Sequence, residues 1–125
     1  MSQIDPLTRA LAHFNAEEYR DALLAFEERR HHERGDVLRA LIQLSNALNQ
    51  LRLGLITSPR RLLASADALL LSYSCYEGIE LRAVRQYIAI LRMQIPEGVE
   101  TGAAAIQWDT IPRLRIERQN EQYEL

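Results

Sequence analysis

Apolar residues recur at helical spacing along most of the chain, and the pattern is most regular between Asp36 and Leu53. Residues three and four positions apart share one face of an α-helix, so this stretch predicts a central helix with an apolar stripe. Asp36 is suited to cap the first turn, and Gly54 is suited to end the helix with a left-handed residue. The stripe consists of Val37, Leu41, Leu44, Leu48 and Leu51.

The opposite side of this predicted helix combines apolar residues with amides. Ile42 and Leu53 lie there, which predicts a helix covered by protein on both sides. Gln43, Asn46 and Gln50 follow the spacing i, i+3 and i+7 and therefore share one side. Buried amides need hydrogen-bond partners. They would form either an internal network that sets the helix register, which is the preferred interpretation, or a polar pocket or interface that binds a partner's backbone.

Two helices are predicted before the central one. Asp5 followed by Pro6 is typical of a helix start, with aspartate as the cap and proline in the first turn. Asn15 and Glu18 have the spacing of a capping box, which predicts the start of a second helix that runs to about residue 30. The apolar face of this second helix comprises Tyr19, Leu23 and Phe26.

Two more helices are predicted after Gly54. Ser58 followed by Pro59 indicates the start of the fourth helix. Its apolar stripe comprises Leu62, Ala66, Leu69 and Tyr73, with Leu63 and Leu70 beside it. Residues 74–78 break the pattern. The fifth helix has the clearest amphipathic spacing in the chain, from Leu81 through Ile95, and Pro96 ends it.

The pattern changes from Glu97 onward, where glycines and alanines precede Trp108 and an alternating apolar and charged stretch follows. This extension is neither a convincing helix nor a sheet in its own right. Trp108 and the isoleucines and leucine near it either fold back over the open side of the bundle or dock onto another protein. The predicted fold is therefore all-α: a single compact bundle of about five helices over residues 1–96, with an irregular C-terminal extension over residues 97–125.

Composition narrows the classes of function. A chain of 125 residues with a net charge of −2 predicts one domain without a general attraction to nucleic acid. All fifteen basic residues are arginine, so lysine-based covalent catalysis is excluded. One cysteine excludes an internal disulfide. The N-terminus lacks the pattern of a secretory signal, and no apolar run is long enough to cross a membrane, so a cytoplasmic location is expected.

No group of residues predicts catalysis or a cofactor. His31, His32 and Glu33 are the most metal-like cluster, but adjacent histidines in a loop diverge, so no metal is expected. Cys75 has no basic neighbour and is interpreted as a small hydrophobic residue. The remaining candidate is a basic patch interspersed with acidic residues, for which local ion pairing is expected. It would consist of Arg29, Arg30, Arg34, Arg60 and Arg61.

The stretches FNAEEYRDALLAFEERR, LRALIQLSNALNQLRLG and RRLLASADALL resemble the small helical proteins catalogued as domain of unknown function 309. The resemblance covers residues 14–91 and implies a short all-helical fold without an assigned activity. Leu23 and Leu24 stand where many members carry a His-Glu pair, and Arg30 stands where they carry a tryptophan. Glu27 matches a later glutamate of the pattern, and Gln43 agrees with it. The resemblance implies that any site using the His-Glu pair is lost here.

These observations predict a non-catalytic protein-interaction or assembly module. Its partner would be another protein or a second copy of the chain, associating through the second face of the central helix. The alternative is a small ligand-binding domain or enzyme with an amide-lined pocket on the central helix. The candidate binding residues are Gln43, Asn46, Gln50, Glu27 and Trp108, with His31 as a further candidate of the alternative.

Overall fold

A computed structural model describes residues 5–31, 33, 35–95 and 107–119. This part of the chain contains five α-helices, a very short β-hairpin and one 3-10 helix, so the predicted all-α fold is confirmed. The helices are α1 (Pro6–Asn15), α2 (Tyr19–Arg30), α3 (Asp36–Arg52), α4 (Thr57–Leu70) and α5 (Leu81–Gln94). The shorter elements are β1 (Cys75–Tyr76), β2 (Ile79–Glu80) and the 3-10 helix η1 (Trp108–Thr110).

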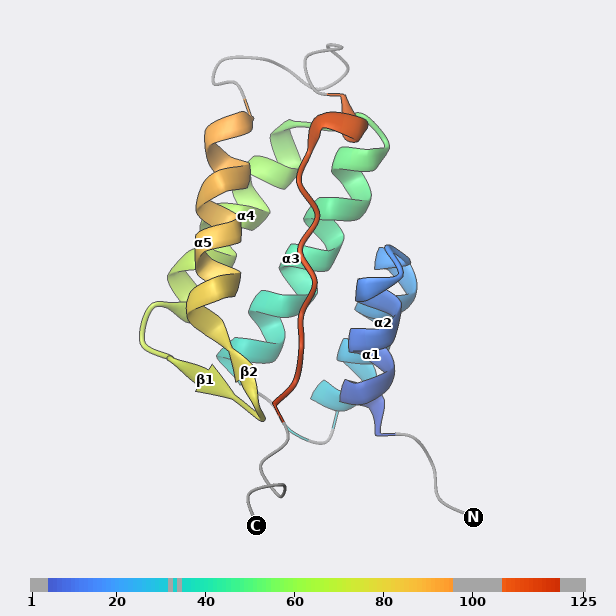
Figure 1. The fold of residues 1–125 in the computed structure, drawn as a ribbon, viewed down its shortest axis with the longest axis vertical. Helices are drawn as coiled ribbons and strands as arrows, with labels where there is room; N and C mark the ends of the chain where they lie inside the picture. The colour runs from blue at the N-terminus through green and yellow to red at the C-terminus, as the bar shows by residue number, and fades with distance from the viewer. Residues whose placement is uncertain (1–4, 32, 34, 96–106, 120–125) are drawn as a thin grey trace.

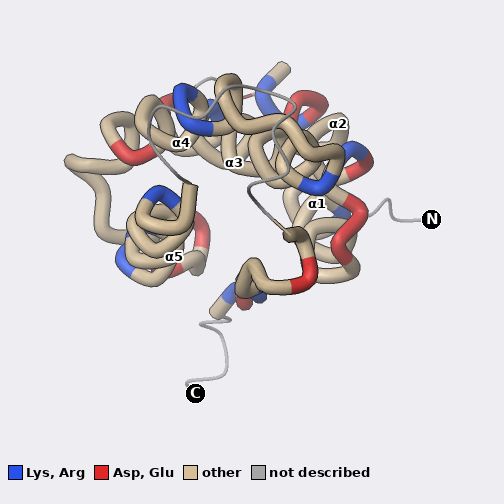
Figure 2. Tube along the Cα trace, turned by 90° about the horizontal axis from the view of Figure 1, so that it is seen from above, with Lys and Arg blue, Asp and Glu red and all other residues tan. Residues whose placement is uncertain are grey.

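The elements form two layers around one apolar core. Helices α2, α3 and α4 lie side by side in the first layer, with α3 in the middle (Figure 1 and Figure 2). Helices α1 and α5 lie in the second layer and are not adjacent. The segment 107–119 passes between them and over α3 (Figure 1). This segment therefore occupies a place in the second layer that a helix would otherwise fill.

Helix α3 is the central element, as its pattern predicts. The whole predicted stripe is buried, and Leu38, Ala40, Ser45 and Ala47 are buried beside it. Gly54 has a φ of 89° and follows the helix as predicted. One expectation is wrong: Leu53 on the second face is 70% exposed. Ile42 is partly buried and packs against the core, so the second face of α3 is only partly covered.

Four predicted helix starts differ in detail. Asp36, the predicted cap of the central helix, is instead the first residue of α3, and the described residues show no side-chain capping bond there. Asp5 precedes α1 but makes no capping bond, and its carboxylate instead accepts a hydrogen bond from Arg29 at 2.8 Å. Asn15 is the last residue of α1, and Glu18 binds His13 at 2.7 Å, so the predicted capping box is not formed. Helix α4 begins at Thr57, before the predicted cap at residue 58.

The predicted apolar stripe matches the buried residues in α5 but only partly in α4. In α4 the buried residues are Pro59, Leu63, Ala66 and Leu70, whereas the predicted Leu62 and Leu69 are only partly buried. Tyr73 lies beyond the end of α4 and is exposed, so its predicted place on the stripe is wrong. In α5 the predicted stripe is confirmed, with Tyr87 buried as well. Pro96 lies outside the described residues.

The β-hairpin was not predicted. Glu77 and Gly78 form its turn with φ values of 50° and 83°, the left-handed conformation that two-residue hairpin turns require. Any Cβ at position 78 would lie 2.5 Å from the carbonyl oxygen of Gln119, so glycine is also needed for close approach of the C-terminal segment. Cys75 is exposed on β1, which corrects its interpretation as a buried hydrophobic residue.

The described part of the C-terminal extension belongs to the same core as the helices. Ile111 and Ile116 are almost fully buried, and Leu114 and Trp108 pack against the core cluster. The segment ends beside the hairpin, where the N–H of Gln119 donates to the carbonyl of Gly78 at 2.7 Å. The apolar core therefore continues beyond residue 96.

Candidate interaction surface

The predicted amide residues lie on the side of α3 that faces away from the core. Gln43, Asn46 and Gln50 are all partly buried, and the Gln50 side chain donates to Asn46 at 3.1 Å. The Oε1 atoms of Gln43 and Gln50 are buried without a hydrogen-bond partner among the described residues. The amides thus form one bond of the expected network, and a ligand could reach the unpaired oxygens only after side chains move.

Glu27 does not join these amides. It is exposed on α2, and its side chain makes no hydrogen bond or ion pair within the described part of the chain. Leu24, at one of the two positions of the His-Glu pair in the resembling family, is 48% exposed. His31 is exposed directly after α2, and His32 lies outside the described residues. The structure therefore does not bring the residues of the predicted pocket together.

Trp108 anchors the C-terminal segment to the α1–α2 corner and the end of α3. Its ring meets the ring of Tyr19 edge to face, with centroids 6.0 Å apart. The guanidinium carbon of Arg113 lies 3.9 Å from the Trp108 centroid, and that of Arg52 lies 5.9 Å away. Each is within the distance at which a cation is attracted to an aromatic face. Trp108 is therefore a structural anchor in this conformation and is only partly accessible.

The same arginines hold the turn between α1 and α2. Glu17 sits in that turn with a φ of 62°, which is unfavourable for a residue with a Cβ. Arg52 donates to its carbonyl at 2.7 Å, and Arg113 donates to its carboxylate at 3.2 Å. These contacts connect the turn, α3 and the C-terminal segment, and they offset the backbone strain at Glu17.

Asn15 supplies the main polar contact between the helices and the extended segment. Its side-chain amide donates to the carbonyl of Ile116 at 3.0 Å and accepts from the N–H of Ile116 at 2.8 Å. Both backbone groups of Ile116 are thereby satisfied as they would be by a neighbouring strand. One side chain thus replaces a β-ladder at this point.

Replacing Asn15 with Ala is expected to loosen the C-terminal segment. The change leaves two backbone groups without their partner, which costs about 1–3 kcal/mol of unfolding free energy. Hydrogen exchange at the Ile116 amide should speed up more than exchange at amides within α3. The control is Asn49→Ala, because Asn49 accepts only a long 3.5 Å contact from Arg52. Equal exchange rates at Ile116 in the wild type and Asn15→Ala would contradict this assignment.

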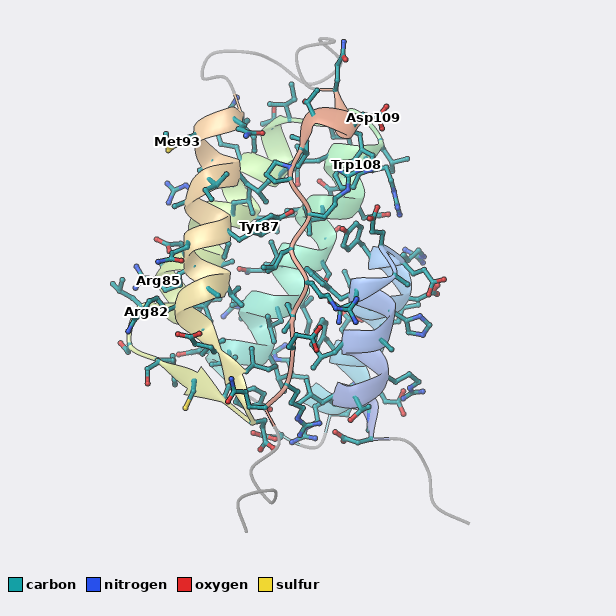
Figure 3. The ribbon with its side chains drawn as sticks, viewed as in Figure 1. Arg82, Arg85, Tyr87, Met93, Trp108 and Asp109 are labelled. Carbon is teal, nitrogen blue, oxygen red and sulfur yellow. The ribbon has the colours of Figure 1, made fainter. Side chains whose placement is uncertain are left out.

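Two buried tyrosines make the same region sensitive to alkaline pH. Burial raises the pKa of Tyr19 to about 12, and the nearby Glu17 carboxylate adds to the rise. Burial also raises the pKa of Tyr87, whose hydroxyl donates to the carbonyl of Pro112 at 2.7 Å. Figure 3 shows the Tyr87 side chain directed from α5 toward the C-terminal segment. Deprotonation of these two tyrosines would therefore place negative charge on α2 and on α5, beside the C-terminal segment.

Tyr19→Phe is expected to reduce the loss of stability at alkaline pH. Unfolded tyrosine loses its proton near its ordinary pKa of 10.0, before the folded Tyr19 at about 12. The stabilising contribution of this group is thus complete below the unfolded value and is lost as the pH rises through the folded one. The Tyr19 hydroxyl has no hydrogen-bond partner among the described residues, so the neutral-pH change should stay within about 0.5 kcal/mol. Urea unfolding of both proteins at neutral and alkaline pH tests this, and parallel pH curves would contradict it.

One group of side chains has the composition of a metal site. Potential ligand atoms of His13, Glu18 and Asp21 lie within 4.8 Å of one another. The group is largely exposed, and His13 is already bonded to Glu18. It lies at the start of α2, whereas His31 follows the end of that helix, so it does not include the described histidine of the predicted metal-like cluster.

The described arginines of the predicted basic patch are divided between two ends of the bundle, and Arg34 lies outside the described residues. Arg29, near the end of α2, binds Asp5 and Glu33 at 2.8 and 2.9 Å, as expected from local ion pairing. Arg60 and Arg61 lie in the first turn of α4, at the opposite end (Figure 1). Arg61 is exposed and makes no ion pair within the described residues. Arg61 therefore differs from Arg29, whose charge is paired with nearby carboxylates.

A groove lies between the start of α4 and the end of α5. Its volume is about 790 Å³, which is within the usual range for ligand-binding clefts. The lining residues are Arg60, Arg61, Ala64, Ala89, Arg92, Met93 and Ile95. Met93 is 85% exposed at the rim, and Ile90 on the same helix is 46% exposed. Figure 3 shows Met93 directed away from the bundle. The groove thus combines arginines with accessible apolar surface.

Charge is divided unevenly between this pair of helices and the remainder of the chain. Helices α4 and α5 together carry five arginines and one aspartate, a net charge of +4, which leaves −6 for all other residues. Figure 2 shows the basic positions on both helices. The aspartate, Asp67, is shared by Arg85 at 3.2 Å and Arg92 at 3.8 Å. The α4–α5 side of the molecule is therefore basic although the chain is acidic.

No family model, curated protein or solved structure matches this chain. The resemblance to domain of unknown function 309 thus stays a prediction. Within the described residues, no helix is both long and apolar enough to cross a membrane.

Sequence reasoning missed the α4–α5 groove. Its residues come from helices that are far apart in sequence, and two of them are alanines that carry no chemical signal. The absence of any acidic residue from α5 was the available clue, because three arginines on one helix then lack a partner within that helix.

Proposed function

We propose that this protein is a non-catalytic interaction module, located in the cytoplasm, that holds a segment of a protein partner in the α4–α5 groove. The observation that carries the proposal is the 85% exposure of Met93 beside three arginines at a concave surface. A flexible, exposed methionine is favourable for binding apolar side chains and costly to leave in water. Arginine is enriched at the energetically important positions of protein interfaces.

The alternative pocket on α3 has less support. Its amide oxygens are covered, and the carboxylate and histidine assigned to it lie elsewhere on α2 or after it. The second face of α3 also supports self-association less well than expected. It presents Leu53 alone among largely polar residues, whereas α5 presents two exposed apolar side chains.

The proposal is tested by photo-crosslinking in the native cell extract. A photoreactive amino acid is placed at Met93 in one protein and at Arg20, exposed on α2, in a matched control. We expect the Met93 protein to crosslink one or a few proteins that the Arg20 protein does not. A crosslinking pattern that is the same at both positions would overturn the groove as the docking surface.

A further inference from the structure

We infer that the α4–α5 groove recognises an acidic peptide segment that also carries apolar side chains. This inference rests on the proposed function and specifies the chemistry of the partner. Three properties of the groove support it: its charge, its apolar lining and its shape.

The charge of the groove favours carboxylates. Arg61, near the start of α4, has no ion-pair partner among the described residues. Arg92 has one weak ion pair, at 3.8 Å, with an aspartate that Arg85 also binds. Arginine binds carboxylates through two parallel hydrogen bonds, and such charge-assisted bonds are stronger than neutral ones. The net charge of +4 on α4 and α5 would attract an acidic segment, while the acidic remainder of the molecule would repel it from other surfaces.

The lining of the groove favours apolar side chains between those carboxylates. Ala64 and Ala89 lie on facing helices and leave room between them, and Ile95 is buried beneath the rim. Met93 and the aliphatic stems of the arginines supply further apolar surface. The groove is lined by both polar and apolar groups, so a segment with both kinds of side chain satisfies it better than a purely acidic one.

The shape and composition favour a peptide over other polyanions. A flat lipid surface cannot contact the floor of a concave site. Single-stranded nucleic acids bind through aromatic side chains that stack on the bases, and none of the described lining residues is aromatic. The net charge of −2 for the whole chain also opposes binding of a long polyanion.

The test uses the full-length protein and a phage-displayed library of random peptides as the probe. Selected peptides are then measured for binding to four variants, which form two matched pairs. Arg61→Glu alters the groove, and Arg39→Glu makes the same charge change at an exposed position of α3. Met93→Gln removes the apolar rim, and Leu53→Gln makes the same kind of change at another exposed position.

We expect the selected peptides to be enriched in aspartate and glutamate together with apolar residues. Arg61→Glu and Met93→Gln should each weaken binding about tenfold or more, whereas the two control variants should leave it unchanged. Binding should also weaken as salt is added.

Other outcomes separate the two proposals. Selected peptides that lack acidic residues but depend on Met93 would overturn the acidic-segment inference and leave the interaction module standing. If no selected peptide loses binding in the groove variants but the Met93-specific crosslink is still present, the acidic-segment inference is overturned and the interaction module stands. A single-stranded DNA oligonucleotide or vesicles of anionic lipid that bind tighter than the peptides, and lose binding in Arg61→Glu, would show that the arginines serve a different anion.

Discussion

A protein that ends at Pro96 is expected to be unfolded, or to lack a cooperative unfolding transition, at room temperature. Truncation removes Ile111 and Ile116, which are 3% and 4% exposed, and uncovers the face of α3 between α1 and α5. Loss of one large buried side chain costs about 2–5 kcal/mol. Domains of this size have only about 5–15 kcal/mol of stability in total. Circular dichroism during heating and urea titration measure the effect.

The matched control for this truncation is a protein that ends at Gln119. It retains every described residue of the C-terminal segment, including the Asn15 contacts and the hydrogen bond to Gly78. We expect its unfolding transition to lie close to that of the full chain. A protein ending at Pro96 that unfolds cooperatively, at a similar urea concentration to this control, would contradict the assignment of the segment to the core.

The helices could be predicted because their burial follows one simple period. In α3 and α5 the apolar residues at steps of three and four are the residues that the core buries. The helix starts could not be predicted as well, because a capping side chain has competing partners in the folded protein. Asp5 is bound by Arg29, and Asn15 by the backbone of Ile116, which is 101 residues away in sequence. Local spacing contains no information about such contacts.

Helix α4 shows a different limit. Leucines occur in adjacent positions at 62–63 and 69–71, so two neighbouring stripes are almost equally apolar. The core buries Leu63 and Leu70, and Leu71 is 62% exposed just after the helix. The choice between the stripes depends on how α4 meets α3, which is a property of the assembled layer. The sequence pattern therefore predicts the helix but not its orientation.

The sites were the least predictable feature. Trp108 is a candidate binding residue of the sequence analysis, and its partners Tyr19, Arg52 and Arg113 come from three separate parts of the chain. The two alternatives for the extension also could not be separated from its own residues. Burial of Ile111 and Ile116 depends on the placement of α1 and α5 on either side of the segment, which is a property of the assembled fold.

Leu48→Ala is expected to lower the free energy of unfolding by about 2–5 kcal/mol. Leu48 is fully buried on the central stripe of α3, so its truncation removes apolar contacts and leaves a cavity that the surrounding helices can only partly fill. Alanine has a helix propensity at least as favourable as that of leucine, so the loss reflects packing alone. Urea unfolding followed by circular dichroism gives the difference directly.

Leu53→Ala, directly after the last residue of α3, is the control. It tests whether the second face of α3 is covered by protein or exposed. If that face were covered by protein, this change would also cost several kcal/mol. Because Leu53 is 70% exposed, we expect a change within about 0.5 kcal/mol. A large loss for Leu53→Ala in dilute solution would mean that another surface covers this position. Equal losses for the two variants would contradict the placement of α3, because its stripe and its outer face would then be equally buried.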